Sequence, residues 1–179
     1  MYSVAICFPE SITAEVRIIK QTLAGKAGWY HSANADAHIT FNRFEADELA
    51  LMIWEKHIEK FCHSVAPFEL RITHPKFHAI GAFYLMPDAS TQKTLKDLKK
   101  HFRKLSPFES EGGSDPHLTI GMGLNELQLK TAMDLWADKK FEFKHQCSSL
   151  SLRKFNNKKE QYEIYREFEF KGSPQIELF

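Results

Sequence analysis

The sequence predicts a single α+β domain over residues 1–179, built as two related lobes. Two observations predict this fold. The order strand, helix, strand, helix, strand can be read twice along the chain, and the third element of each round begins with the same pattern of His, apolar, Thr, apolar. The composition agrees, because 43% hydrophobic and 26% charged residues are typical of a globular protein.

The first round is bounded by proline, glycine and a helix-capping serine. Pro9 ends the opening apolar run, Ser11 is the expected N-cap of the first helix, and Gly25 is expected to end it. Pro67 closes the second helix. The elements of this round are a strand at residues 3–8, a helix from Ser11 to Gly25, a strand at 38–41, a helix at 46–65 and a strand at 68–73.

The second round repeats this order and is followed by a hairpin. Pro87 ends its first strand, and the pair Asn156-Asn157 supplies the turn of the hairpin. The predicted elements are a strand at 79–86, a helix at 90–105, a loop at 106–116, a strand at 117–122, a helix at 125–137, a strand at 141–147, and the hairpin strands 149–155 and 162–170.

The two repeated tetrads are His38-Ile39-Thr40-Phe41 and His117-Leu118-Thr119-Ile120. Side chains alternate between the two faces of a strand, so the His and Thr of each tetrad project together while the apolar residues enter the core. If the lobes are related by an approximate two-fold axis, the two polar pairs face each other across a cleft. The tetrads are therefore the candidate catalytic residues.

These residue types suit the cleavage of a phosphodiester. The reaction needs one group that takes a proton from the attacking oxygen and one that gives a proton to the leaving oxygen. Histidine can do either near neutral pH. Threonine hydroxyls can donate to the phosphate oxygens on which negative charge gathers in the transition state. Such a site needs no metal ion.

The paired tetrads, with Pro116 before the second and 79 residues between the histidines, resemble the two-histidine (2H) phosphoesterase superfamily. Its members include RNA 2′,3′-cyclic phosphodiesterases and proteins called 2′-5′ RNA ligases. The resemblance covers essentially the whole chain, from the opening strand that ends in Phe8-Pro9 to a closing strand pair with Leu152 and Tyr162. It implies a bilobal fold in which each lobe has an antiparallel sheet with packed helices, and an active-site cleft lies between the lobes.

The resemblance also implies roles for single residues. His38 and His117 would divide the base and acid roles, and Thr40 and Thr119 would hold the phosphate. Many family members have a basic residue five positions after the motif histidine, and here the first motif keeps it as Arg43 whereas the second has Met122. Arg153 and Tyr162 would lie near the cleft and contact phosphate or base.

For three further features a structural explanation is weighed against a functional one. Tyr30, in Trp29-Tyr30-His31, either stacks on a nucleobase or covers the edge of the core. The lysine-rich stretch 93–104 is interpreted as a solvated helix face. His74 and His78 have the spacing of a metal pair on a helix, but Pro75 argues against a helix there, so no metal site is expected.

The leading prediction is hydrolysis of a 2′,3′-cyclic phosphate or a 2′-5′ linkage in a nucleotide or RNA end, without a cofactor. One alternative is a 2′-5′ RNA ligase that uses the same groups in the reverse sense. A nucleotide-binding module without catalysis and a structural protein with two coincidental motifs are the others.

Charge and composition limit the partners. A net charge of +1 argues against binding along an extended nucleic-acid duplex, and no apolar run is long enough for a membrane span. From the three widely spaced cysteines we expect no disulfide framework, and from the opening residues we expect no secretory signal. We therefore expect a cytoplasmic monomer.

Overall fold

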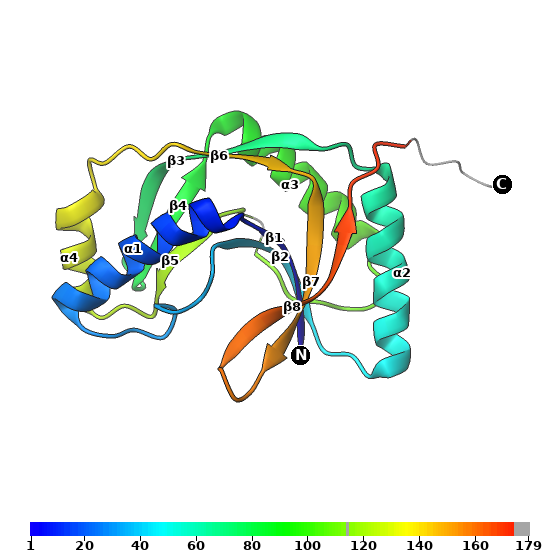
Figure 1. The fold of residues 1–179 in the computed structure, drawn as a ribbon, viewed down its shortest axis with the longest axis horizontal. Coiled ribbons are helices and arrows are strands. Elements are labelled where there is room, and N and C mark those ends of the chain that lie inside the picture. Colours follow the sequence, from blue (N-terminus) through cyan, green and yellow to red (C-terminus); the bar gives the residue numbers. More distant parts are fainter. Residues whose placement is uncertain (114, 174–179) are drawn as a thin grey trace.

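The structure is a computed structural model that describes residues 1–113 and 115–173 (Figure 1). In these residues two antiparallel sheets and four helices form the expected α+β, two-lobe fold. The strands are β1 (Tyr2–Cys7), β2 (His38–Phe44), β3 (Phe68–His78), β4 (Ala82–Pro87), β5 (Leu118–Met122), β6 (Phe143–Cys147), β7 (Ser149–Asn156) and β8 (Gln161–Glu169). The helices are α1 (Glu10–Ala27), α2 (Glu48–Ser64), α3 (Ala89–Lys104) and α4 (Glu126–Trp136).

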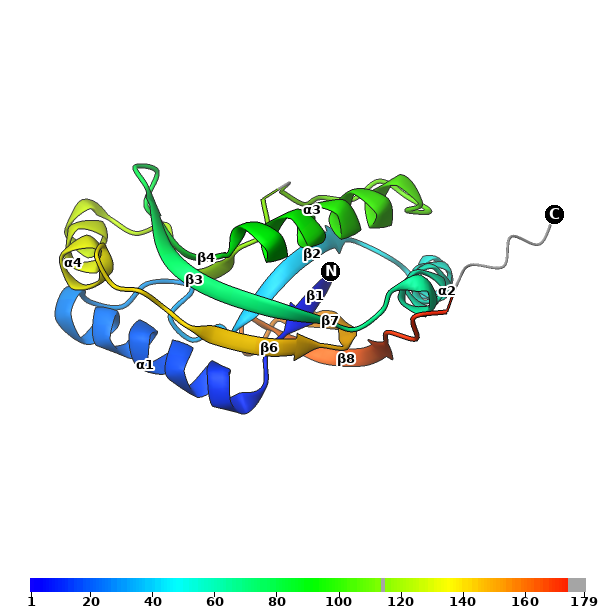
Figure 2. The same cartoon turned by 90° about the horizontal axis from the view of Figure 1, so that it is seen from above.

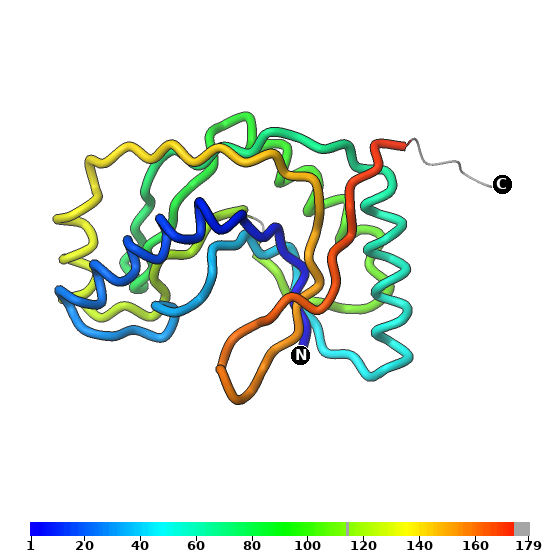
Figure 3. The backbone as a smooth tube through the Cα atoms, in the orientation of Figure 1, coloured from blue at the N-terminus to red at the C-terminus, as the bar shows by residue number. Residues whose placement is uncertain are grey.

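Each sheet has four strands, in the orders β2-β1-β7-β8 and β5-β4-β3-β6. The lobes therefore exchange strands, which the order of elements along the sequence does not predict. β3 belongs to the first round, but it pairs with β4 because a short turn joins the two as a hairpin. The space beside β1 is taken instead by β7, so the N-terminal and C-terminal parts of the chain lie side by side (Figure 3).

The two histidine strands carry the same irregularity. Thr40 faces Ala5 across the β1–β2 ladder, and Thr119 faces Tyr84 across the β4–β5 ladder. In both ladders the register shifts directly after the threonine, which leaves one extra residue in the histidine strand. A bulge bends its strand and increases the local twist. The two lobes thus present their tetrads with matching local geometry.

Three helices begin after capping side chains, whereas the bounds predicted for the first helix are wrong. Asp47, Asp88 and Asn125 each accept a hydrogen bond from a backbone N–H of the first turn of α2, α3 and α4. The first helix, in contrast, begins directly after Pro9 and passes through Gly25. It ends at Gly28, whose φ of 87° places it in the left-handed region that glycine tolerates.

β3 is longer than the sequence predicts and contains Pro75. The ladder between β3 and β6 ends at Ile72, so the missing N–H of Pro75 leaves no gap in a pairing with β6. The turn to β4 includes Gly81, where a Cβ atom would lie 2.2 Å from the carbonyl oxygen of Leu124. The strand predicted at residues 79–86 starts only at Ala82, because residues 79–81 form the turn.

The helices are packed on the outside of the two sheets. α1 contacts α4 and β5, α2 contacts β7 and β8, and α3 contacts β3 and β4 (Figures 1 and 2). Most buried apolar residues of both sheets form one large cluster with Trp54, Phe61 and Phe102, and the other face of β4 adds a small second cluster of Ala82, Tyr84 and Met86. No helix within the described part of the chain combines the length and apolar character needed to cross a membrane.

Candidate active site

The two tetrads line one cavity of about 260 Å³. The apolar residues of both tetrads are buried, whereas the two histidines and two threonines are half-buried. All four of these polar residues line the cavity. His38 and Thr40 come from β2, Thr119 comes from β5, and His117 lies one residue before β5. The structure thus brings together side chains from strands that are in contact across the lobes.

Both imidazoles are held in the same way. Nδ1 of His38 is 2.7 Å from the carbonyl oxygen of Asp36, and Nδ1 of His117 is 2.9 Å from that of Asp115. A carbonyl oxygen only accepts hydrogen bonds, so each Nδ1 carries a hydrogen and donates it. The neutral ring then has its lone pair on Nε2, and the charged ring has a second donor there. Nε2 is therefore the nitrogen available to a substrate.

The surroundings of His38 disfavour its charged form. Burial is the main cause, and the positive charges of Arg153, Lys20 and Arg43 add to it. The hydrogen bond to the Asp36 carbonyl opposes these effects, but the pKa of His38 is still lowered to about 3. At neutral pH this imidazole is uncharged in the free protein.

His117 has a different environment. Its ring stacks on that of Tyr84, with 3.9 Å between the ring centroids and 24° between the planes. Burial lowers the pKa of His117, and the charges of Lys99 and His78 act in the same direction, whereas the carbonyl and the carboxylate of Asp115 oppose them. The position in β1 that corresponds to Tyr84 holds Ala5, so β1 offers His38 no such ring.

Two buried lysines belong to the site although the sequence did not reveal them. Lys99 is 3% exposed, lines the cavity of the tetrads and donates to the carbonyl oxygen of Thr40 at 2.9 Å. Lys20 is 1% exposed and donates to the carbonyl oxygens of Ser32 and Ala35. They are 79 positions apart, as the two histidines are. Burial lowers the pKa of both lysines to about 8.

The interpretation of residues 93–104 as a solvated face is therefore wrong for Lys99. Leu95, Lys99 and Phe102 follow one another at the spacing that keeps side chains on one helix face, and both apolar neighbours are fully buried. Val16, Lys20 and Leu23 repeat this arrangement in α1. A lysine inside an apolar helical stripe was the signal that could have identified these residues.

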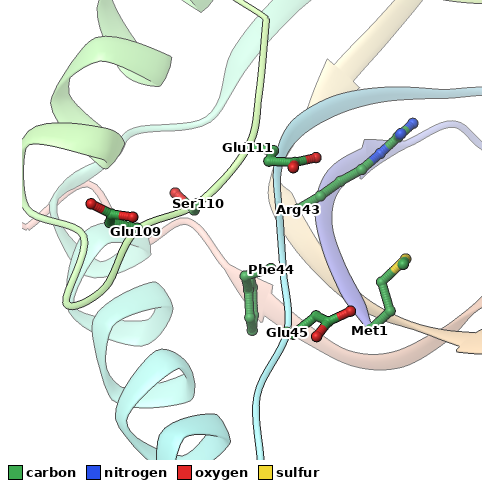
Figure 4. Close-up of a pocket in the computed structure, with 7 residues that line it drawn as sticks. All are labelled: Met1, Arg43, Phe44, Glu45, Glu109, Ser110 and Glu111. Carbon is green, nitrogen blue, oxygen red and sulfur yellow. The ribbon is translucent and has the colours of Figure 1, made fainter.

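The loop before the second tetrad is tied to β2 through Glu111. Arg43 and Glu111 exchange backbone hydrogen bonds of 2.7 and 2.9 Å, and Figure 4 shows the two residues beside each other in a further pocket that they line with Phe44 and Ser110. A Cβ atom on Gly112 would lie 2.7 Å from the carbonyl oxygen of Phe41, so only glycine allows this close approach. Residues 111–113 therefore line one side of the tetrad cavity.

A second cavity of about 370 Å³ adjoins the first and shares His38, Arg43, Thr119 and Met122 with it. Arg153 and Tyr162 line this second cavity, so the structure brings three of the four expected substrate-binding residues to the cleft. Tyr30 is the exception. Its ring is buried in the core, and its hydroxyl donates to the carbonyl oxygen of Lys20 at 3.3 Å. It covers the core and lines neither cavity, which corrects the stacking role considered for it.

The described residues hold no group of three or more His, Cys, Asp or Glu side chains arranged for a metal ion. His74 and His78 lie on β3, in agreement with the argument from Pro75 against a helix.

Comparisons with known proteins agree with this fold. The model of the 2′-5′ RNA ligase superfamily matches residues 8–159. The protein TT0787 of Thermus thermophilus is similar over 96% of this chain and 98% of its own, with a TM-score of 0.62 and 12% identity. E. coli LigT complexed with 3′-AMP is similar over 97% of this chain and 98% of its own, with a TM-score of 0.61 and 16% identity.

The complex of E. coli LigT with NADP+ is also similar, over 95% of this chain and 97% of its own, with a TM-score of 0.59 and 16% identity. At such identities the likeness shows the shared fold. No curated protein sequence matches the chain.

Proposed function

The chain belongs to the 2′-5′ RNA ligase superfamily, and we propose that it hydrolyses 2′,3′-cyclic phosphates or 2′-5′ linkages of nucleotides and RNA ends without a metal ion. The observation that carries this proposal is the convergence of both His and Thr pairs on one cavity. The complexes of LigT with 3′-AMP and NADP+ support a nucleotide as the substrate class.

For a cyclic phosphate the two histidines have complementary tasks. One Nε2 accepts a proton from water as the water oxygen bonds to phosphorus. The other Nε2–H gives a proton to the ribose oxygen as its bond to phosphorus breaks. The product is a phosphomonoester with a free neighbouring hydroxyl. Protons and charge balance, because one imidazole gains the proton that the other loses.

We assign the base role to His38 and the acid role to His117. Burial, together with the cations around His38, keeps its ring neutral at neutral pH, which a base requires. The ring of Tyr84 lies against His117, and the face of an aromatic ring favours an adjacent cation, which the acid must be before it donates. A bound phosphate adds negative charge and raises the pKa of both rings.

The remaining polar groups would stabilise the phosphate. Within the described residues neither Thr40 nor Thr119 has a hydrogen-bond partner for its hydroxyl, so both can donate to non-bridging oxygens. Lys99 holds a positive charge at neutral pH beside both tetrads. Together these groups oppose the charge that develops on the phosphate in the transition state.

The test is turnover of a nucleoside 2′,3′-cyclic phosphate before and after treatment with EDTA. We expect His38→Ala and His117→Ala each to lower kcat by about a hundredfold or more, since general acid–base catalysis contributes roughly 10²–10⁴-fold. His63→Ala, in the last turn of α2 and outside both cavities, is the matched control and should keep full activity. Loss of wild-type activity in EDTA would refute the metal-independent mechanism.

Ligation is the second candidate, favoured by the family that the chain matches. It would use the same groups with a hydroxyl of a second RNA end in place of water: one Nε2 takes the hydroxyl proton as that oxygen bonds to phosphorus, and the other Nε2–H protonates the departing ribose oxygen of the cyclic phosphate. Incubation of one labelled oligonucleotide that ends in a cyclic phosphate with a second that has a free hydroxyl separates the reactions. Hydrolysis opens the cyclic phosphate to a phosphomonoester and leaves the length of the oligonucleotide unchanged, whereas ligation gives a longer product.

A further inference from the structure

The second cavity contains groups that the proposed reaction does not use. It borders the tetrad cavity at His38, Arg43, Thr119 and Met122. Its outer wall is formed by Arg153 and Tyr162 of the β7–β8 hairpin. This hairpin projects from the body of the fold (Figure 1). The side-chain amide of Gln161 donates to the carbonyl oxygen of Asn34 at 2.9 Å, so the hairpin is held across the cavity.

Arg153 is the most unusual group in this wall. It is 5% exposed, and its Nη2 donates to the hydroxyl of Ser3 at 3.1 Å. Its Nε is buried and has no hydrogen-bond partner among the described residues, and none of the ion pairs found there includes Arg153. A buried guanidinium without an anion is costly, because its lost hydration is not replaced. Burial accordingly lowers the pKa of Arg153.

Other positive charges near Arg153 add to the cost of burying its guanidinium. Arg43 and Lys20 line the same cavity, whereas its acidic residues are Asp36 and Glu160. Asp36 already has a cationic partner, since its carboxylate lies 3.4 Å from Arg17. Among the described residues none of the three cations Lys20, Arg43 and Arg153 forms an ion pair with a carboxylate, although all three line the cavity next to the site of the scissile phosphate.

The wall also offers aromatic surface. The guanidinium carbon of Arg153 lies 5.3 Å from the centroid of the Tyr162 ring, and Phe155 packs edge-on against that ring at 5.1 Å. Phe155 and Tyr162 both line the cavity. A sugar or base could pack on these rings while an anionic group approaches Arg153.

We propose that this second cavity binds a further phosphoryl group of the substrate, with Arg153 as its anchor. This inference rests on the proposed function and narrows its substrate class. In an RNA end the terminal nucleotide has, besides the scissile phosphate, a 5′-phosphate that links it to the chain. The preferred substrate is then an RNA end or an oligonucleotide, and a free nucleoside cyclic phosphate lacks the second anchor.

The test measures binding by calorimetry and needs no turnover. We expect the wild-type protein to bind adenosine 3′,5′-bisphosphate about tenfold or more tightly than adenosine 3′-monophosphate, the effect of a charge-assisted hydrogen bond. Arg153→Gln should abolish this preference while its affinity for the monophosphate changes by less than about threefold. Lys154→Gln removes the neighbouring exposed cation and should keep the preference.

Equal wild-type affinities for the two ligands overturn the proposal, as does a preference that survives in folded Arg153→Gln. If that variant does not fold, the ¹⁵N resonance of Arg153 Nε in the wild-type protein decides the question. It should move with the bisphosphate and not with the monophosphate, and the same shift with both ligands refutes the subsite. A protein that prefers the bisphosphate but hydrolyses no cyclic phosphate would refute the proposed function and leave the subsite standing.

Discussion

Lys20 makes a quantitative prediction about stability, because its charge is buried. Its pKa in the folded protein is about 8, against 10.5 for an ordinary lysine, and its side chain is 1% exposed. Below pH 8 the amine is charged in both the folded and the unfolded chain. Between about pH 8 and 10.5 the folded protein has lost this proton while the unfolded chain keeps it. Since the unfolded chain then binds more protons, the free energy of unfolding rises with pH.

The size of this rise follows from the shift in pKa. At 1.36 kcal/mol per pH unit, the shift corresponds to about 3 kcal/mol of stability gained between pH 8 and 10.5. We expect Lys20→Met to lack this gain, because methionine does not titrate. Urea unfolding of both proteins should be measured from pH 7 to 10.5. Over this range the unfolding free energy of the wild type, relative to that of Lys20→Met, should increase by about 3 kcal/mol.

Lys26→Met is the matched control, since Lys26 is an exposed lysine of the same helix. Its unfolding free energy should follow that of the wild type over the whole pH range. Parallel curves for the wild type and Lys20→Met would show that the buried amine does not titrate in this range, and the reasoning about this buried charge would be refuted.

Three further predictions concern the cleft. Tyr84→Leu should lower the pKa of His117 further, because the aromatic face that favours the imidazolium is lost; Tyr84→Phe should not, and an NMR titration in which both variants behave alike would contradict the assignment. Gly112→Ala should destabilise the protein by about 1–3 kcal/mol through overlap with the Phe41 carbonyl, whereas Gly113→Ala, with nothing within 4 Å of its Cβ, should be close to neutral in thermal unfolding. The pH profile of kcat/KM should fall as pH rises through the pKa of His117, below 6.5, because only the charged ring donates; a basic limb that persists in His117→Ala would identify another acid.

The fold and the tetrads could be predicted from the sequence because both depend on local periodicity. Alternation along a strand predicts that His38 and Thr40 project from one face while their apolar neighbours enter the core, and the folded sheet has this arrangement. The exchange of β3 and β7 between the sheets could not be predicted in this way, because strand order depends on which pairings close across the whole domain.

The site residues that the sequence did not reveal were missed for the same reason, because their positions depend on tertiary contacts. Lys99 and Lys20 look like surface lysines when charge is counted along the chain, and only their place in an apolar stripe distinguishes them. Tyr30 has the sequence context of a stacking residue, because it lies in a polar stretch before the first histidine strand. Its hydrogen bond to the Lys20 carbonyl and its burial are tertiary contacts that the local sequence does not reveal.

The central claim is that His38 and His117 act on one phosphorus atom. The most direct measurement is the ¹⁵N NMR spectrum of the histidine rings during titration with adenosine 3′-monophosphate. We expect the Nε2 signals of both rings to move together and to saturate with a single Kd, while Nδ1 of each ring stays protonated. If only one ring responds, or if the two saturate with different constants, the histidines do not share a phosphate and the proposed mechanism is wrong.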